Sequence, residues 1–185
     1  MSRKRRNFAA GFILATLSLV SLLALPDSVQ AQVQTSGKTL PLALATEAAQ
    51  EAVRSCEAGG YRVSVSVVDV AGVERAFLRG DRSTIHTRET AFKKAYTVAT
   101  LGPIFASTTT SALTERISKT PTGPALSTVN NIILLAGGVA IRSGDETLAA
   151  IGVGGAPGGA LDEVCAQAGV AKVQDRVNAL QLPKP

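Results

Sequence analysis

The sequence contains few of the residues on which nucleic-acid-binding sites depend. Among its 185 residues there is no tryptophan, and aromatic residues make up only 4%. A nucleic-acid-binding protein needs a clustered basic face and usually aromatic side chains on which bases stack. After residue 31 no three consecutive residues are basic. We therefore expect no nucleic-acid partner.

Histidine and cysteine are also scarce, which limits the kinds of catalytic site. With one histidine a pair of imidazole ligands is impossible, and the sequence shows no recognisable Ser/His/Asp set. The two cysteines do not form a C-x-x-C motif, which argues against a redox motif or a thiolate metal cluster. The phosphate-binding pattern G-x-x-x-x-G-K-[ST] is also missing, so nucleotide hydrolysis is not supported. The sequence leaves open whether the protein is an enzyme.

The first 31 residues have the pattern of an export signal. Residues 3–6 are basic, residues 8–25 are mostly apolar, and small residues fit a cleavage site after Ala31. Pro26 ends an apolar core that is short for a stable membrane span, although an uncleaved anchor is the alternative. Residues 5–8 resemble part of a twin-arginine signal, so the route stays open between Sec and twin-arginine export. We expect a periplasmic or extracellular protein without stable membrane insertion.

The remaining chain is long enough for one domain with a real core. Residues 1–31 hold four of the 19 basic and one of the 14 acidic residues, so the mature chain carries a charge of only +2. We expect residues 32–45 to be a flexible lead-in, because their start is polar and contains Gly37 and Pro41. A single domain then covers residues 46–182.

Hydrophobic periodicity and turn residues divide this domain into helices and strands. We expect three helices to be capped by Thr46, Thr87 and a Ser/Thr-rich stretch that ends at Thr110. The predicted helices cover residues 47–58, 88–101, 161–168 and 170–180, with a short helix that holds Leu113 and Ile117. The predicted strands cover residues 61–70, 74–79, 132–135, 139–142 and 147–153. The hairpins predict an α/β protein of the α+β type, with an antiparallel sheet of about five strands flanked by helices.

Six segments in this order resemble one known family. They are residues 48–53 (AAQEAV), 63–69 (VSVSVVD), 93–97 (KKAYT), 110–113 (TSAL), 135–141 (LAGGVAI) and 151–163 (IGVGGAPGGALDE). Together they are similar to the GlcG/HbpS-like haem-binding (haem-degrading domain) family, which is related to the PduO C-terminal domain. The resemblance implies a haem ligand and a homo-oligomer, from dimer to octamer. It also implies that the hydroxyl of Thr110 faces the iron, whereas the residues alone are equally consistent with a helix cap.

His86 is the only residue that offers an imidazole to haem iron or another metal. It precedes the second predicted helix, so it lies either at the mouth of a pocket or in a solvated loop. Arg88, Lys93 and Lys94 follow along that helix, where they either pair with haem propionates or only solvate its surface. Tyr96 and Phe105 are candidates to cover the porphyrin face.

Two further features leave alternatives open. The loop at residues 154–159 is rich in glycine, so its amides either hold an anion at a helix N-terminus or allow close backbone packing. Cys56 and Cys165 form a disulfide in an oxidising compartment or remain free core residues.

The leading hypothesis is an exported haem-binding protein that captures, buffers or presents haem, with a haem-degrading or haem- and iron-sensing role as an extension. The alternative is an enzyme or accessory protein that acts on a small carboxylated metabolite. A structural or signalling oligomer with a vestigial pocket is the third reading.

Overall fold

Strands with alternating residue types form an antiparallel sheet. The computed structural model describes residues 36–182, and the predicted signal peptide at residues 1–31 lies outside this range. The strands are β1 (Ser64–Asp69), β2 (Glu74–Arg79), β3 (Gly138–Ser143) and β4 (Glu146–Gly154). They follow the order β2-β1-β4-β3, and all three pairs are antiparallel. The predicted α+β fold is therefore confirmed, with four strands in place of about five.

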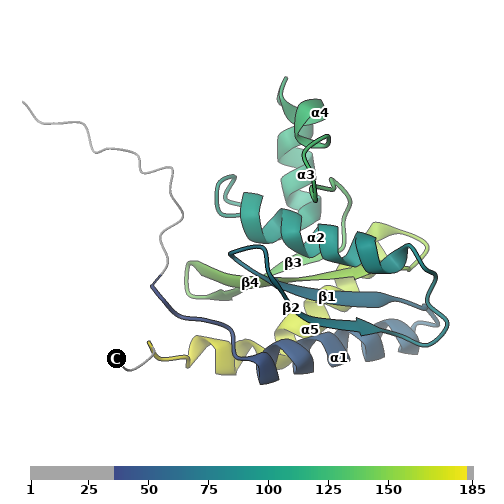
Figure 1. Cartoon of the computed structure of the whole chain (residues 1–185), viewed down its shortest axis with the longest axis vertical. Coiled ribbons are helices and arrows are strands. Elements are labelled where there is room, and N and C mark those ends of the chain that lie inside the picture. Colours follow the sequence, from purple (N-terminus) through teal and green to yellow (C-terminus); the bar gives the residue numbers. More distant parts are fainter. Residues whose placement is uncertain (1–35, 183–185) are drawn as a thin grey trace, which may run out of the picture. The chain divides into compact units, whose positions relative to one another are not determined.

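Helices cover both faces of this sheet (Figure 1). The helices are α1 (Leu42–Ala58), α2 (Thr87–Leu101), α3 (Thr110–Ser118), α4 (Gly123–Leu126) and α5 (Gly159–Asn178). The two helices α1 and α5 lie together on one face, and α2 lies on the other, with α3 and α4 beyond it. Helix α2 thus lies on the face opposite α1 and α5.

The larger part of the core lies between the sheet and the pair α1 and α5. In β1 the side chains of Val65 and Val67 are fully buried on this face, and those of Ile151 and Val153 join them from β4. A disulfide between Cys56 in α1 and Cys165 in α5 links the two helices, with a Cα–Cα distance of 5.5 Å. This settles the alternative that the sequence left open for the cysteines.

Small residues on the other face of the sheet let α2 approach closely. A side-chain carbon at Gly152 of β4 would lie 2.1 Å from the backbone oxygen of Ala91, so only glycine fits there. Ala150 of β4 also has a small side chain, which packs with Val98 and Ala99 of α2. Helix α2 is therefore held against the backbone of the sheet.

The predicted caps Thr46 and Thr87 are wrong, whereas the predicted Ser/Thr-rich stretch does cap α3. Helix α1 begins at Leu42 behind an extended Pro41, so Thr46 is not its cap and the end of the predicted flexible lead-in is helical. Thr87 is the first residue of α2, and its hydroxyl donates to the backbone oxygen of Thr84. Thr109 caps α3 by accepting from the amide of Ala112, which leaves the hydroxyl of Thr110 for other partners.

Two further predictions differ from the structure. Residues 132–135 do not form a strand, because this segment bonds to a helix: the amide of Ile133 donates to the hydroxyl of Thr97 in α2. The two C-terminal helices predicted at 161–168 and 170–180 are one helix, α5, which continues through a buried Gly169. The close approach of Ala48 in α1 requires a residue without a side chain at that position.

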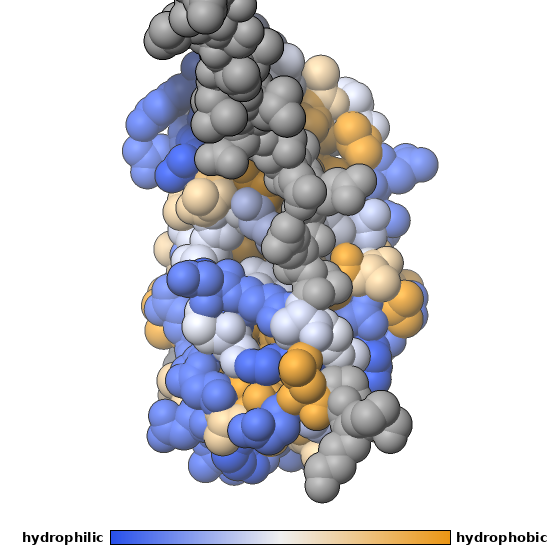
Figure 2. All heavy atoms as spheres, turned by 90° about the vertical axis from the view of Figure 1, so that its left-hand side faces the viewer, coloured by the Kyte–Doolittle hydropathy of each residue, from blue (hydrophilic) through white to orange (hydrophobic). Residues whose placement is uncertain are grey.

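No helix in residues 36–182 has the length and apolar character required to cross a membrane. Hydrophilic residues predominate on the face drawn in Figure 2, where hydrophobic residues form small separate groups.

Candidate functional site

His86 lies at the junction between a loop and α2. It occupies the N-cap position of the helix and is exposed. Its ring nitrogen Nδ1 lies 3.3 Å from the hydroxyl oxygen of Thr84. The backbone oxygen of His86 accepts from the amide and the hydroxyl of Thr90. The backbone of His86 is therefore part of the first helical turn, while the ring stays accessible.

A cleft of about 520 Å³ opens beside His86. Its walls come from three parts of the chain: the start of α2, the segment before β3, and the glycine-rich loop that leads into α5. The lining residues are Thr84, His86, Thr90, Lys94, Leu135, Ala136 and residues 155–160 and 162. A second hollow of about 390 Å³, lined by Ile85, His86, Arg88 and Glu89, adjoins the same histidine. His86 thus lies between two concave surfaces.

A buried ion pair is part of the lining of the cleft. Lys94 of α2 and Asp162 of α5 have side chains that are 5% and 4% exposed, and Nζ lies 2.6 Å from Oδ2. The other oxygen of Asp162 accepts from the amide of Ala156 in the glycine-rich loop, at 2.9 Å. Burial raises the pKa of the Asp162 carboxyl, although the Lys94 ammonium acts in the opposite direction. The charge of Lys94 is therefore matched within the protein.

Gly137 makes room for this ion pair. It adopts φ +124°, and a side-chain carbon there would lie 2.8 Å from Nζ of Lys94 and 2.9 Å from the Cβ atom of Asp162. Glycine at position 137 is therefore required by packing around the buried pair.

A second carboxylate next to the first organises the start of α3. Glu163 accepts from the amides of Ser111 and Gly137, each at 3.2 Å, and from the hydroxyl of Ser111. The hydroxyl of Thr110 donates to Glu163 at 3.5 Å and accepts from the amide of Gly138 at 2.8 Å. Because Thr110 is also fully buried, its hydroxyl serves this internal network.

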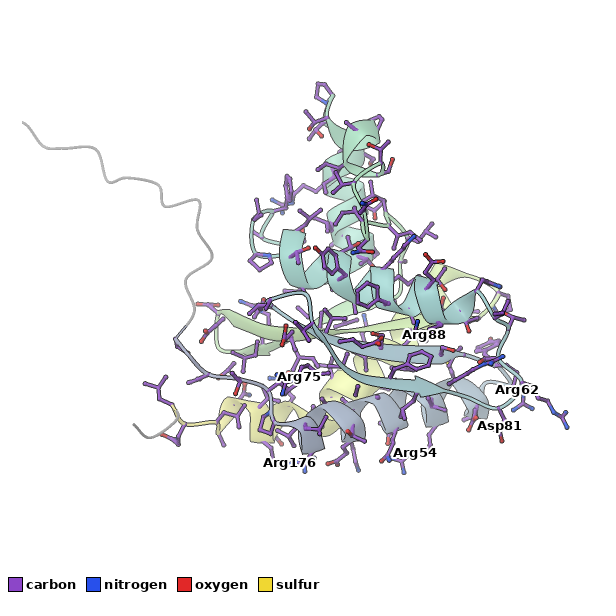
Figure 3. All side chains as sticks on the ribbon, viewed as in Figure 1. Arg54, Arg62, Arg75, Asp81, Arg88 and Arg176 are labelled. Carbon is purple, nitrogen blue, oxygen red and sulfur yellow. A yellow bond between two sulfur atoms is a disulfide. The ribbon has the colours of Figure 1, made fainter. Side chains whose placement is uncertain are left out.

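The remaining candidate residues lie apart from the cleft or face away from it. The side chain of Arg88, labelled in Figure 3, is 68% exposed. It lies 3.7 Å from the Glu74 carboxylate and 5.3 Å from the centre of the Phe77 ring. Lys93 pairs with Glu89 one turn earlier in α2, at 3.2 Å. The ring of Tyr96 packs over Gly72 in the turn between β1 and β2. Phe105 is half-buried in the loop between α2 and α3.

The seven candidates therefore do not form one cluster. His86 and Lys94 line the same cleft, and Arg88 lines the hollow on the other side of His86. Neither of these concave surfaces is lined by Thr110, Lys93, Tyr96 or Phe105. Within residues 36–182 no group of three or more His, Cys, Asp or Glu side chains is arranged to hold a metal ion.

Sequence reasoning missed three residues of this region. Asp162 and Glu163 stand out in the sequence only as the end of the segment at residues 151–163, and nothing in the sequence singles out Thr84. A lysine on the predicted helix and two adjacent acidic residues after a glycine-rich loop were the available signal. It was too weak, because the ion pair joins positions 68 residues apart.

Comparison with known proteins gives both a family and structural relatives. The model of the family described as "Haem degrading protein HbpS-like" matches residues 40–171. A crystal structure of HbpS is 38% identical, with a TM-score of 0.67, and the match covers 75% of this chain and 92% of that chain. A double mutant of HbpS from Streptomyces reticuli is 36% identical, with the same TM-score and coverage of 80% and 96%.

A more distant solved structure shares the fold alone. The PduOC:heme complex is 22% identical, with a TM-score of 0.63, and the match covers 73% of this chain and 95% of that chain. No curated protein sequence is significantly similar to the chain.

Proposed function

The chain belongs to the family of HbpS-like haem-degrading proteins, and from this premise we propose that it is an exported haem-binding protein that captures, buffers or presents haem. The observation that carries the proposal is the position of His86, the only histidine, between two concave surfaces at the start of α2. The related fold of PduOC has been crystallised as a haem complex, which supports the same ligand class.

The residues around His86 fit a haem group in their chemistry. A neutral imidazole is a common protein ligand of haem iron. Ile85 is 88% exposed and Leu135 is 52% exposed, so two apolar side chains next to the concave surfaces are available to a porphyrin. The larger cleft, at about 520 Å³, has the size of ordinary ligand sites.

Each of these residues has a separate part in the proposed binding. His86 supplies the nitrogen that contacts the iron. The exposed guanidinium of Arg88 is the cation available to a propionate through charge-assisted hydrogen bonds. Bound haem would supply the iron-centred chemistry, while this surface selects and orients the ligand. Because the hydroxyl of Thr110 is occupied by Gly138 and Glu163, the proposal places the iron contact at His86.

Titration of the purified mature protein with haemin tests this function. We expect a saturable shift of the Soret band in the wild type and its loss in His86→Ala. Thr110→Ala is the comparison variant, because the sequence resemblance implies an iron contact there. A shift that is lost in Thr110→Ala but kept in His86→Ala would overturn the contact at His86. The absence of any saturable shift in the wild type, with thermal stabilisation by small carboxylic acids, would favour the alternative function.

Export and assembly are part of the same proposal. Export rests on the signal pattern in residues 1–31 and is supported by the Cys56–Cys165 disulfide, since such bonds persist mainly in oxidising compartments. A mature N-terminus near Gln32 in protein recovered from the periplasm or medium is the expected result. Assembly into a homo-oligomer is proposed from the family resemblance and from exposed apolar residues on α5.

A further inference from the structure

Hydrogen bonds from Arg79 and Thr87 fix the backbone of the loop before α2. Arg79 donates to the backbone oxygen of Ser83 at 2.7 Å, and the hydroxyl of Thr87 donates to the backbone oxygen of Thr84 at 2.6 Å. The Thr87 hydroxyl also lies 2.8 Å from that of Ser64 in β1, and both residues are fully buried. The main chain of Thr84 is therefore fixed to the sheet, although its side chain is exposed.

The fixed position of Thr84 places its hydroxyl beside one nitrogen of the His86 ring. The Thr84 oxygen and Nδ1 are 3.3 Å apart, whereas Nε2 has no hydrogen-bond partner within residues 36–182. A neutral imidazole carries its proton on one nitrogen, so this contact exists in two forms. If the hydroxyl donates to Nδ1, then Nε2 carries the proton and cannot bind a metal. If Nδ1–H donates to the hydroxyl, then Nε2 keeps its lone pair.

We propose that Thr84 is a positioning residue that accepts the Nδ1 proton of His86 and so presents Nε2 as the nitrogen that binds iron. The inference rests on the proposed haem-binding function. Histidines that bind metals almost always donate their second ring N–H to an oxygen acceptor, and this contact selects the tautomer and the ring orientation. Among the described residues, the hydroxyl of Thr84 is the acceptor in reach of Nδ1.

The single histidine allows the tautomer to be measured without haem. In untagged protein labelled with ¹⁵N-histidine, the ring gives one pair of nitrogen signals, recorded at a pH where the imidazole is neutral. We expect Nδ1 to show the shift of a protonated nitrogen and Nε2 that of an unprotonated one. Thr84→Val should move the population toward protonated Nε2, and Thr84→Ser should restore the wild-type pattern.

Thr90→Val is the matched control. Thr90 lines the same cleft, but its hydroxyl bonds only to the backbone oxygens of His86 and Thr87, each at 3.2 Å. The control should leave the ring signals unchanged. A wild-type ring protonated on Nε2, or a Thr84→Val ring identical to wild type, would overturn the inference.

Haem titration of the same variants separates this inference from the proposed function. Loss of an outer hydrogen bond to a metal ligand typically reduces affinity by about 10- to 100-fold, so we expect a loss of that size in Thr84→Val and near wild-type affinity in Thr84→Ser. If His86→Ala binds haem like the wild type, the proposed iron contact fails whatever the tautomer. If His86→Ala abolishes binding and Thr84→Val does not weaken it, only the role of Thr84 fails.

Discussion

Asp162 shows how one buried residue serves two neighbouring elements. One carboxylate oxygen accepts from Lys94 of α2 and the other from Ala156 of the loop before α5. The Asp162 side chain thereby connects α2 with the glycine-rich loop on the other side of the cleft. A buried ion pair is weak evidence for stability, because desolvation of both charges opposes their attraction. Its clearer role is to fix the geometry of the cleft wall next to His86.

The buried Asp162 makes stability depend on pH. Burial raises the pKa of its carboxyl above the ordinary value of 3.8, against the effect of Lys94. Between pH 3.8 and the raised pKa of the folded protein, the folded chain binds more protons at Asp162 than the unfolded chain does. The contribution of Asp162 to the free energy of unfolding therefore falls as pH rises. We expect urea unfolding from about pH 4 upward to show this contribution in the wild type, while Asp162→Asn lacks it. Identical pH slopes in the two proteins would contradict the prediction.

At the residue scale the sequence located His86 at the start of a helix but not its surroundings. A unique residue type next to a helix start is visible in the sequence, but the predicted cap was Thr87, and only the structure places His86 at the N-cap of α2. The burial of Lys94 was not predictable, because Lys93 and Lys94 are adjacent residues of the same type. In the helix their side chains point in different directions, Lys93 toward Glu89 and Lys94 toward Asp162. Only the packed structure shows which of the two lysines is buried.

At the scale of elements, periodicity predicted most helices and strands, and tertiary contacts explain the failures. The valine and serine alternation of β1 predicted a strand whose two faces differ, and the hairpins to β2 and between β3 and β4 formed as expected. Residues 132–135 are apolar enough for a strand, but the segment bonds to α2 through Ile133. Glycine usually weakens a helix interior, yet Gly169 is retained in α5 because Ala48 of α1 packs against it.

The disulfide between α1 and α5 should contribute substantially to stability. It joins residues 109 positions apart, and cross-links that close long loops restrict the unfolded chain most. We expect the Cys56→Ala/Cys165→Ala double variant to lose about 2–4 kcal/mol of unfolding free energy, the usual range for such a bond. Guanidinium unfolding measures the change. Wild-type protein in a reducing buffer is the matched comparison, since it loses the bond but keeps both sulfur atoms. A loss below about 0.5 kcal/mol in both would contradict the prediction.

At the scale of the whole molecule, exposed apolar residues gather near the start of α5. Leu161 and Val164 lie one helical turn apart and are 38% and 60% exposed. Leu135 is 52% exposed, and its neighbour Ala136 contacts Gly159 at the first position of the helix. The face drawn in Figure 2 instead carries mostly hydrophilic residues. Apolar groups rimmed by polar surface are typical of contacts between subunits.

We expect the mature protein to be at least a dimer, with Leu161 and Val164 of α5 covered by a second copy. Size-exclusion chromatography with light scattering measures the mass. Val164→Glu should shift the protein toward the monomer, because a charge buried in a subunit contact without a partner is costly. Val73→Glu is the matched control: Val73 is 56% exposed in the turn between β1 and β2 and should leave the mass unchanged. A wild-type monomer would contradict assembly itself. An unchanged oligomer in Val164→Glu would place the contact elsewhere on the surface.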